Sequence, residues 1–315
     1  MHGRFSFAGG KATKLSKYGS TSGERIRRAV VSATLCSANK LEYHLIDSEW
    51  KWHYLMSHEA QQLLDASPGL TTVLTFSSRH LNSLRIVRQT VQSLKTGEGL
   101  ALNLVVGNKA YMTDREARRP PVRTLVDMVK FAKRNFSYVP TFIGTEGLTR
   151  KAVELAEQYD LVPMLLLDKT LEKSMKVIRD YSGMKRVALY VPYLVSSNYP
   201  RLLHDILYRL SGYILRRTWV QKEMRRLGYE PTLRTLGAVI QEKKPLSPRL
   251  MSSELGIFLK KAASTLTIYG TPDAVAERMR FLKNLGITTV FGFPIKENEQ
   301  QIVTFGECVR KTNIS

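Results

Sequence analysis

Cysteine is nearly absent from this sequence, and the two that occur, Cys36 and Cys308, lie far apart. Such a pair provides neither a disulfide framework nor a zinc-binding spacing. The chain also has no metal-ligand spacing of other residue types and no Gly-x-Ser-x-Gly nucleophile motif. These absences argue against metal catalysis and against hydrolysis by an activated serine, and they favour a reducing compartment.

Long apolar runs are missing as well. No stretch approaches the roughly 20 apolar residues that a membrane span needs, although 43% of the 315 residues are hydrophobic. The N-terminal segment, MHGRFSFAGGKATKL, has no continuous apolar core of the kind found in secretory signals. We therefore expect a protein with a large buried core, no membrane segment and a cytoplasmic location.

Acidic residues are few relative to basic ones. The sequence has 48 Lys and Arg and 27 Asp and Glu, which gives a net charge of +21. A charge of this size is compatible with affinity for nucleic acid or for a membrane surface. However, the basic residues are spread along the chain without a long unbroken run, and no nucleic-acid-binding motif accompanies them. The sequence therefore favours basic outward helix faces over a nucleic-acid partner. A basic pocket for an anionic cofactor or substrate is compatible with either interpretation.

The clearest local pattern is a helix followed by a buried strand in residues 268–307. Thr271 suits a helix N-cap, Pro272 suits the first helical position, and Gly286 follows the last apolar residue of the helix as a stop. Residues 287–291 then form a short β-branched run of the buried-strand type. This is one half of a parallel βα unit.

The same alternation runs through most of the chain, with polar loops expected at 9–23 and 109–120. Expected strands are 4–8, 41–46, 71–76, 100–106, 141–143, 161–167, 186–191 and 287–291. Expected helices are 24–38, 58–66, 81–94, 122–134, 148–158, 170–181, 272–285 and 297–309. About eight strand–helix units predict a single α/β domain over residues 1–315, a (β/α)8 TIM barrel, with a helical insertion at 196–261 after strand 7. An open doubly wound sheet is the alternative.

Four stretches carry a resemblance to a known superfamily. They are LEYHLIDSEW, TTVLTFSSRHLNSLRIVRQTVQSLKTGEGLALNLVVGN, PTFIGTEGLTRKAVELAEQYD and YGTPDAVAERMRFLKNLGITTVFGF. In order and spacing they resemble the bacterial-luciferase-like oxidoreductases. That superfamily includes flavin monooxygenases and coenzyme F420-dependent enzymes such as methylenetetrahydromethanopterin reductase. The resemblance implies a luciferase-like barrel, a bound FMN or coenzyme F420, hydride transfer to or from a small organic substrate, and dimerisation of identical chains.

The resemblance also implies catalytic positions after the second strand. Asp47 stands where the family often has Asp followed by His, but here the next residue is Ser48. The histidine that some family dehydrogenases use is therefore not kept, and Asp47 and Glu49 are the remaining candidates for proton transfer. A helix or turn cap is an equal alternative for Asp47.

Two further groups of positions are implied as cofactor contacts. Thr72, Val73 and Thr75 lie on the third strand, where the family often has a non-prolyl cis peptide behind the flavin ring; here it would fall at Thr72–Val73. An ordinary strand is the alternative. Gly107 and Asn108 end the fourth strand, and the Asn side chain offers both a donor and an acceptor to a flavin. A plain turn is equally compatible with this pair.

The turn after the fifth strand is the candidate phosphate site. Gly144, Thr145 and Gly147 precede a helix, and glycines at a helix N-terminus let backbone N–H groups approach a phosphate. Glu146 within the turn argues against close phosphate contact unless its side chain points outward.

The departures from the family pattern support a rival interpretation. Ser48, Glu146 and Leu161 differ from what the family usually carries. A degenerate barrel that has lost its catalytic activity and serves as a binding or structural subunit is therefore the alternative to an oxidoreductase.

Overall fold

The protein is built around a closed barrel of parallel strands. The computed structural model describes residues 8–14, 22–47, 57–94, 98–109, 112–146, 149–181, 183–197, 199–240, 246–296 and 298–313. The barrel strands are β1 (Ala8–Lys14), β2 (Tyr43–Asp47), β3 (Thr71–Ser77), β4 (Leu100–Val105), β5 (Thr141–Gly144), β6 (Val162–Leu166), β7 (Ala188–Val195) and β9 (Thr289–Pro294). Each pairs in parallel with the next, and the β6–β7 and β9–β1 pairings close the circle. This confirms the predicted (β/α)8 barrel and excludes the open sheet.

The first strand lies further along the chain than predicted. The expected strand was 4–8, followed by a loop, whereas β1 occupies Ala8–Lys14, and residues 1–7 lie outside the described part. Pairing with β2 on one side and β9 on the other makes this Gly- and Lys-rich segment a strand despite its weak local signal. Gly9 also permits close packing, because an added Cβ would lie 2.7 Å from Val309.

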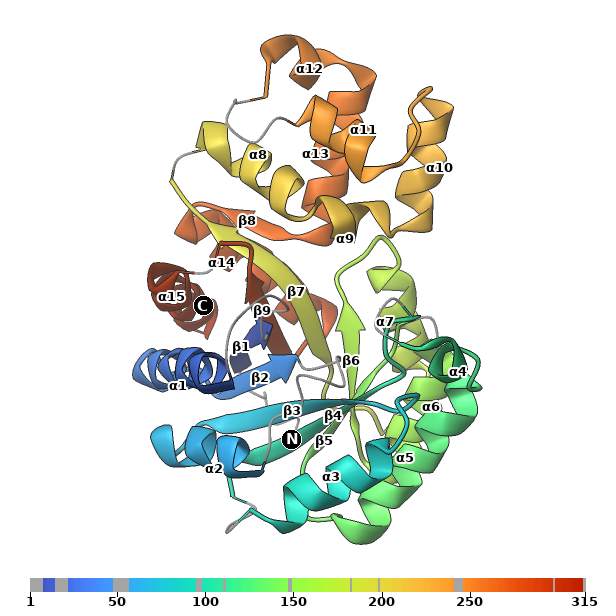
Figure 1. Ribbon diagram of the computed structural model, residues 1–315. Helices are drawn as coiled ribbons and strands as arrows, with labels where there is room; N and C mark the ends of the chain where they lie inside the picture. The colour runs from blue at the N-terminus through green and yellow to red at the C-terminus, as the bar shows by residue number, and fades with distance from the viewer. Residues whose placement is uncertain are drawn as a thin grey trace.

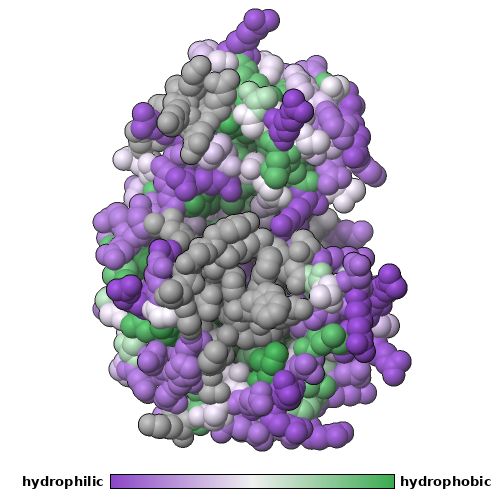
Figure 2. Space-filling view, viewed as in Figure 1, coloured by the Kyte–Doolittle hydropathy of each residue, from purple (hydrophilic) through white to green (hydrophobic). Residues whose placement is uncertain are grey.

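Helices surround the barrel and bury their apolar faces against it (Figure 1). The helices on the outside of the barrel are α1 (Ser22–Ala38), α2 (Ser57–Ala66), α3 (Ser83–Gln92), α5 (Pro121–Asn135), α6 (Thr149–Tyr159), α7 (Leu171–Arg179), α14 (Pro272–Leu285) and α15 (Glu299–Asn313). A short additional helix, α4 (Asp114–Ala117), lies within the segment that was expected to be a loop. Figure 2 shows hydrophilic residues on much of the outer helical surface, in line with the dispersed charge. Among the described helices, none combines the length and the apolar character needed to cross a membrane.

The caps predicted for α14 are confirmed. The Thr271 side chain accepts a hydrogen bond from the backbone N–H of Ala274 at 3.3 Å. Gly286 ends the helix with φ of 108°, a left-handed conformation that residues with a Cβ adopt only with strain.

A group of helices between β7 and β9 stands apart from the barrel, above it in the view of Figure 1. These helices are α8 (Tyr199–Arg209), α9 (Ser211–Leu215), α10 (Thr218–Arg226), α11 (Leu233–Val239), α12 (Pro248–Ser252) and α13 (Glu254–Leu266). They share a hydrophobic core of their own, which also includes Leu194 and Ile295 at the ends of barrel strands. After α13 comes the short strand β8 (Ile268–Gly270), which was not predicted and which pairs with the end of β7.

Aromatic rings fill the lower part of the barrel interior. Tyr43, Phe142 and Phe291 meet there, with ring centroids 5.3 to 5.9 Å apart. Smaller apolar side chains such as Val73 complete this interior cluster. The lower part of the barrel is therefore packed rather than hollow.

Candidate functional site

The carboxyl ends of the barrel strands carry a group of partly exposed, inward-facing residues. Side chains alternate along a strand, so Asp47, Tyr190 and Phe293 point to the same interior as the buried Leu45, Ala188 and Phe291 below them. The upper residues are half-buried, whereas the lower ones are fully buried. This end of a (β/α)8 barrel is where catalytic residues are found in enzymes with this fold.

A hydrogen bond joins two strands across this end of the barrel. The Tyr190 hydroxyl of β7 donates to Oδ2 of Asp47 on β2, at 3.1 Å. The Tyr190 ring is stacked on Phe293 of β9, with centroids 6.5 Å apart and an interplanar angle of 13°. Asp47 therefore lies at the mouth as predicted from the sequence, held by a tyrosine that the sequence did not single out.

A second polar pair lies on β3 and β4. The Asn103 side-chain NH2 donates to the Thr75 hydroxyl at 3.1 Å, and both residues are buried. The Asn103 Oδ1 atom has no hydrogen-bond partner within the described part of the chain. A buried acceptor without a partner is costly, so this amide marks a place where a ligand or a water would be stabilised. Its sequence signal is a single polar residue in the apolar run LALNLVV.

The other two predicted residues on β3 do not lie at the mouth. Val73 is part of the interior cluster near the aromatic rings, and Thr72 faces the opposite side of the strand. The peptide bond between them is trans, as are all peptide bonds in the described residues.

The turn at Gly107 and Asn108 is held by a buried arginine. The Arg79 guanidinium donates to the carbonyl oxygens of Gly107, Val106 and Ala117 at 2.9 to 3.3 Å. Only 3% of Arg79 is exposed, and burial lowers its pKa. Arg79 therefore anchors the loop after β4, while Asn108 next to it is half-buried.

The turn after β5 uses its polar donors within the protein. The backbone N–H and the hydroxyl of Thr145 both bond to the Met164 carbonyl oxygen of β6, each at 3.1 Å. Neither donor is thus directed to a phosphate. The side chain of Glu146 is largely exposed and points away to Arg217. Gly147 and the second catalytic candidate, Glu49, lie outside the described residues.

Arg217 connects the upper helices to two loops of the barrel. Its guanidinium is 3.2 Å from Glu146 after β5 and 3.4 Å from Asp168 after β6, and it lies 4.5 Å above the Tyr213 ring. Burial tends to lower the pKa of Arg217, but Tyr213, Glu146 and Asp168 outweigh it and raise the pKa. This charge is therefore engaged in structure and is not a free counter-charge for a ligand.

Comparison with known proteins places the chain in a family. A family model described as a family of unknown function (DUF7388) matches residues 31–301. The chain belongs to this family. It is also 24% identical over 176 residues to the uncharacterized protein MJ1239 of Methanocaldococcus jannaschii, a match that spans 56% of this chain and 66% of that protein.

Solved structures share the fold of this DUF7388 member at low identity. An F420-dependent secondary alcohol dehydrogenase, solved with an F420–acetone adduct, has 13% identity and a TM-score of 0.66, with 98% of this chain and 99% of that chain covered. The oxygenating constituent of 3,6-diketocamphane monooxygenase from Pseudomonas putida, in complex with FMN, has 10% identity and a TM-score of 0.63, covering 98% and 97%. The monooxygenase RslO1 of Streptomyces bottropensis has 11% identity and a TM-score of 0.62, covering 95% and 98%. The fold is thus the luciferase-like barrel.

Proposed function

We propose that this protein is an oxidoreductase that binds FMN or coenzyme F420 at the carboxyl end of its barrel and acts on a small organic substrate. The observation that carries the proposal is the pair of polar contacts Asp47–Tyr190 and Thr75–Asn103, which lie above the mainly apolar and aromatic lower interior. Four different strands supply these side chains to one end of the barrel. Structural neighbours of the same fold include one protein described with F420 and one described with FMN, which supports the choice of cofactor class.

The residues present fit the ring of such a cofactor better than its phosphate. The unpartnered Asn103 Oδ1 could accept a hydrogen bond from a ring N–H, and the Asp47–Tyr190 pair lies at the same end of the barrel. Both donors of Thr145, by contrast, are engaged with Met164. We therefore assign ring contacts to Asn103 and Thr75 and no phosphate contact to Thr145.

A flavin or deazaflavin supplies hydride transfer, while the protein supplies orientation, electrostatics and proton transfer. Tyr190 holds the Asp47 carboxylate at the mouth of the barrel, where this carboxylate would accept a proton from a substrate hydroxyl. The Phe293 ring is stacked on Tyr190 and helps to hold the tyrosine hydroxyl at that carboxylate.

The proposal is tested by cofactor binding to the purified protein. Protein from the native host is examined for a flavin or deazaflavin absorption band and by mass spectrometry of the released small molecules. The purified protein is then titrated with FMN and with F420, and binding is followed by cofactor fluorescence. Absence of binding of both cofactors at high micromolar concentration would refute the proposal.

Two variants localise the site. Asn103→Leu removes the amide at the mouth and is expected to weaken cofactor binding by about tenfold, the value of one good hydrogen bond to a buried acceptor. Tyr43→Phe is the control, because it removes a polar group from the aromatic cluster in the lower interior and should leave binding unchanged.

A degenerate barrel without catalysis is the second candidate, and specific contacts favour it. In the turn that would hold a phosphate, the backbone N–H and the hydroxyl of Thr145 both donate to the Met164 carbonyl oxygen. Glu146 in the same turn forms an ion pair with Arg217. If the site is lost, the unpartnered Asn103 amide is only a cost to stability. Asn103→Leu should then raise the free energy of unfolding, with neither FMN nor F420 changing the melting temperature of the native protein. Under the enzyme proposal, at least one of these cofactors raises that temperature.

A further inference from the structure

A pocket of about 280 Å³ lies where the upper helices meet the barrel. Its walls are the end of β7, the first turns of α8, and the connection from β9 to α15. The charged side chains that line it are Arg201 and Asp205 of α8 and Lys296 after β9. None of the residues of the proposed cofactor site contributes to this pocket.

The described residues that line the pocket carry more positive than negative charge. Lys296 is paired with Asp205 at 2.5 Å. Arg201 lines the same pocket and is exposed, and its guanidinium has no hydrogen bond or ion pair with any other residue that the structure describes. Among the described side chains of the lining, two cations therefore face one carboxylate, and a planar donor group is available for an anion.

The wall formed by α15 is rigid and adds to the positive potential. The Gln301 side chain bonds to both the N–H and the carbonyl oxygen of Val195, at 2.9 and 2.7 Å, which fixes this helix against the end of β7. Asn298 accepts a hydrogen bond from the Gln301 N–H at 2.9 Å and so precedes the first turn of α15. The first turn of this 15-residue helix borders the pocket, where the helix dipole favours negative charge, although Glu299 in the same turn offsets part of this effect.

We propose that this pocket binds the oxyanion group of a small metabolite, a phosphate ester or a carboxylate. The guanidinium of Arg201 bonds two oxygens of the anion, and Lys296 contributes a third contact when its pairing with Asp205 loosens. The volume is at the lower end of ligand pockets and suits a molecule of a few carbon atoms. The loops after the seventh and eighth strands of a (β/α)8 barrel also often hold phosphate groups. The inference does not depend on a flavin being bound at the barrel mouth.

The test uses the full-length protein and three defined anions: inorganic phosphate, glycerol 3-phosphate and succinate. Binding is measured by calorimetry at constant ionic strength, because screening alters every contact between exposed charges. Binding of the phosphate compounds but not succinate assigns the site to phosphate esters, and the reverse result assigns it to carboxylates. Failure of all three anions to bind at millimolar concentration overturns the proposal.

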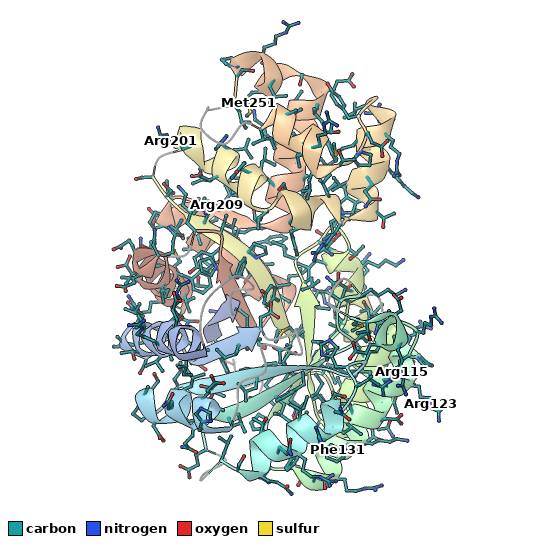
Figure 3. The ribbon with its side chains drawn as sticks, viewed as in Figure 1. Arg115, Arg123, Phe131, Arg201, Arg209 and Met251 are labelled. Atoms are coloured by element: carbon teal, nitrogen blue, oxygen red, sulfur yellow. The ribbon has the colours of Figure 1, made fainter. Side chains whose placement is uncertain are left out.

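Two arginines of α8 provide a matched comparison (Figure 3). Arg201→Gln should weaken anion binding by about tenfold, through loss of a charge-assisted bidentate contact. Arg209→Gln removes the same charge from the other end of the same helix, outside the pocket lining, and should change binding by less than about twofold. Equal effects of the two substitutions would show attraction by net charge alone and would overturn the proposal.

A third variant is expected to increase the affinity for the anion instead of lowering it. Asp205→Asn removes the competing carboxylate and releases Lys296, so the affinity for the same anion should rise by about fivefold or more. A purely structural role for the Lys296–Asp205 pair predicts weaker or unchanged binding in this variant, and either result would contradict the assignment.

Discussion

Tyr190 and Asp47 are 143 residues apart in the chain, and one hydrogen bond joins them inside the barrel. Neither residue type is unusual for its strand, and no local pattern predicts the contact. What distinguishes the pair is its surroundings, because the described side chains in the interior below it are mainly apolar and aromatic. At the scale of single residues, function depends on such contacts more than on the helix and strand pattern.

Tyr190→Phe tests the contribution of this hydrogen bond to stability. Removal of the hydroxyl leaves the Asp47 carboxylate with one partner fewer in a half-buried position, and the free energy of unfolding should fall by about 1 kcal/mol. Urea denaturation followed by circular dichroism measures the change. Tyr138→Phe serves as the control, since 65% of Tyr138 is exposed and no loss is expected. Equal losses in both variants would contradict a specific role for the pair.

Glu116 should make stability depend on acid pH. Burial raises its pKa, but hydrogen bonds from the backbone N–H groups of Thr113 and Leu81 and from the Thr113 hydroxyl outweigh it, so the pKa is about 2 instead of the ordinary 4.5. Because the folded-state pKa is depressed, its contribution is present above about pH 4.5 and is lost as pH falls toward 2.

Glu116→Gln shows this contribution directly. At pH 7 the variant should be less stable than the native protein by about 1 to 3 kcal/mol, since charged hydrogen bonds are replaced by neutral ones. The two unfolding curves should converge as pH is lowered from 4.5 toward 2. A gap in stability that stays constant over this pH range would exclude the carboxylate as its source.

The sequence supports some site residues better than others. Asp47 and Thr75 could be placed at strand ends from the pattern alone, and both are at or next to the mouth. Asn103 and Tyr190 were missed because their importance comes from contacts between distant strands. The use of Thr145 donors by Met164 was equally inaccessible, since it depends on the β5–β6 pairing.

At the scale of elements, the capping of α14 offers a clean comparison with α7. Thr271 caps α14 with its side chain, whereas Thr170 occupies the same position before α7 without a side-chain cap bond. Thr271→Ala should lower the free energy of unfolding by about 1 kcal/mol, and Thr170→Ala should have little effect. Thermal or chemical denaturation measures the stability of the two variants. Similar losses of stability in Thr271→Ala and Thr170→Ala would show that the Thr271 cap bond is not the cause.

Element prediction succeeded where local signals were strong. The buried strands of five or more apolar residues and the amphipathic helices were found within a few residues of their observed ends. Two failures have the same physical cause. Each segment gives a weak strand signal by itself: AGGKATK is rich in Gly, Ala and Lys, and IYG is too short to show an alternating pattern, although Ile and Tyr favour strands. Both are strands because neighbouring strands pair with them.

At the scale of the whole molecule, Arg217 holds the upper helices to the barrel. Arg217→Gln leaves Asp168 largely buried with one partner fewer, and a loss of about 1 to 3 kcal/mol is expected, together with faster proteolysis within α8–α13. Arg226→Gln is the control, because Arg226 forms an exposed pair with Glu223 on α10. Such exposed pairs contribute little to stability because water screens them. Cleavage at equal rates in both variants would contradict the role of Arg217.

The pairing of β7 with β8 has a consequence for protein engineering. Val195 and Gly270 are register partners, so the chain leaves the barrel and returns to it at neighbouring points, about 5 Å apart as in any pair of adjacent strands. The intervening helices have their own hydrophobic core and could be exchanged as a cassette. Because β7 and β8 are parallel, a tight turn cannot join them, but a direct link from Val195 to Gly270 that omits the rest of β8 together with the helices would span this gap. The result would be a minimal barrel for comparing different insertions.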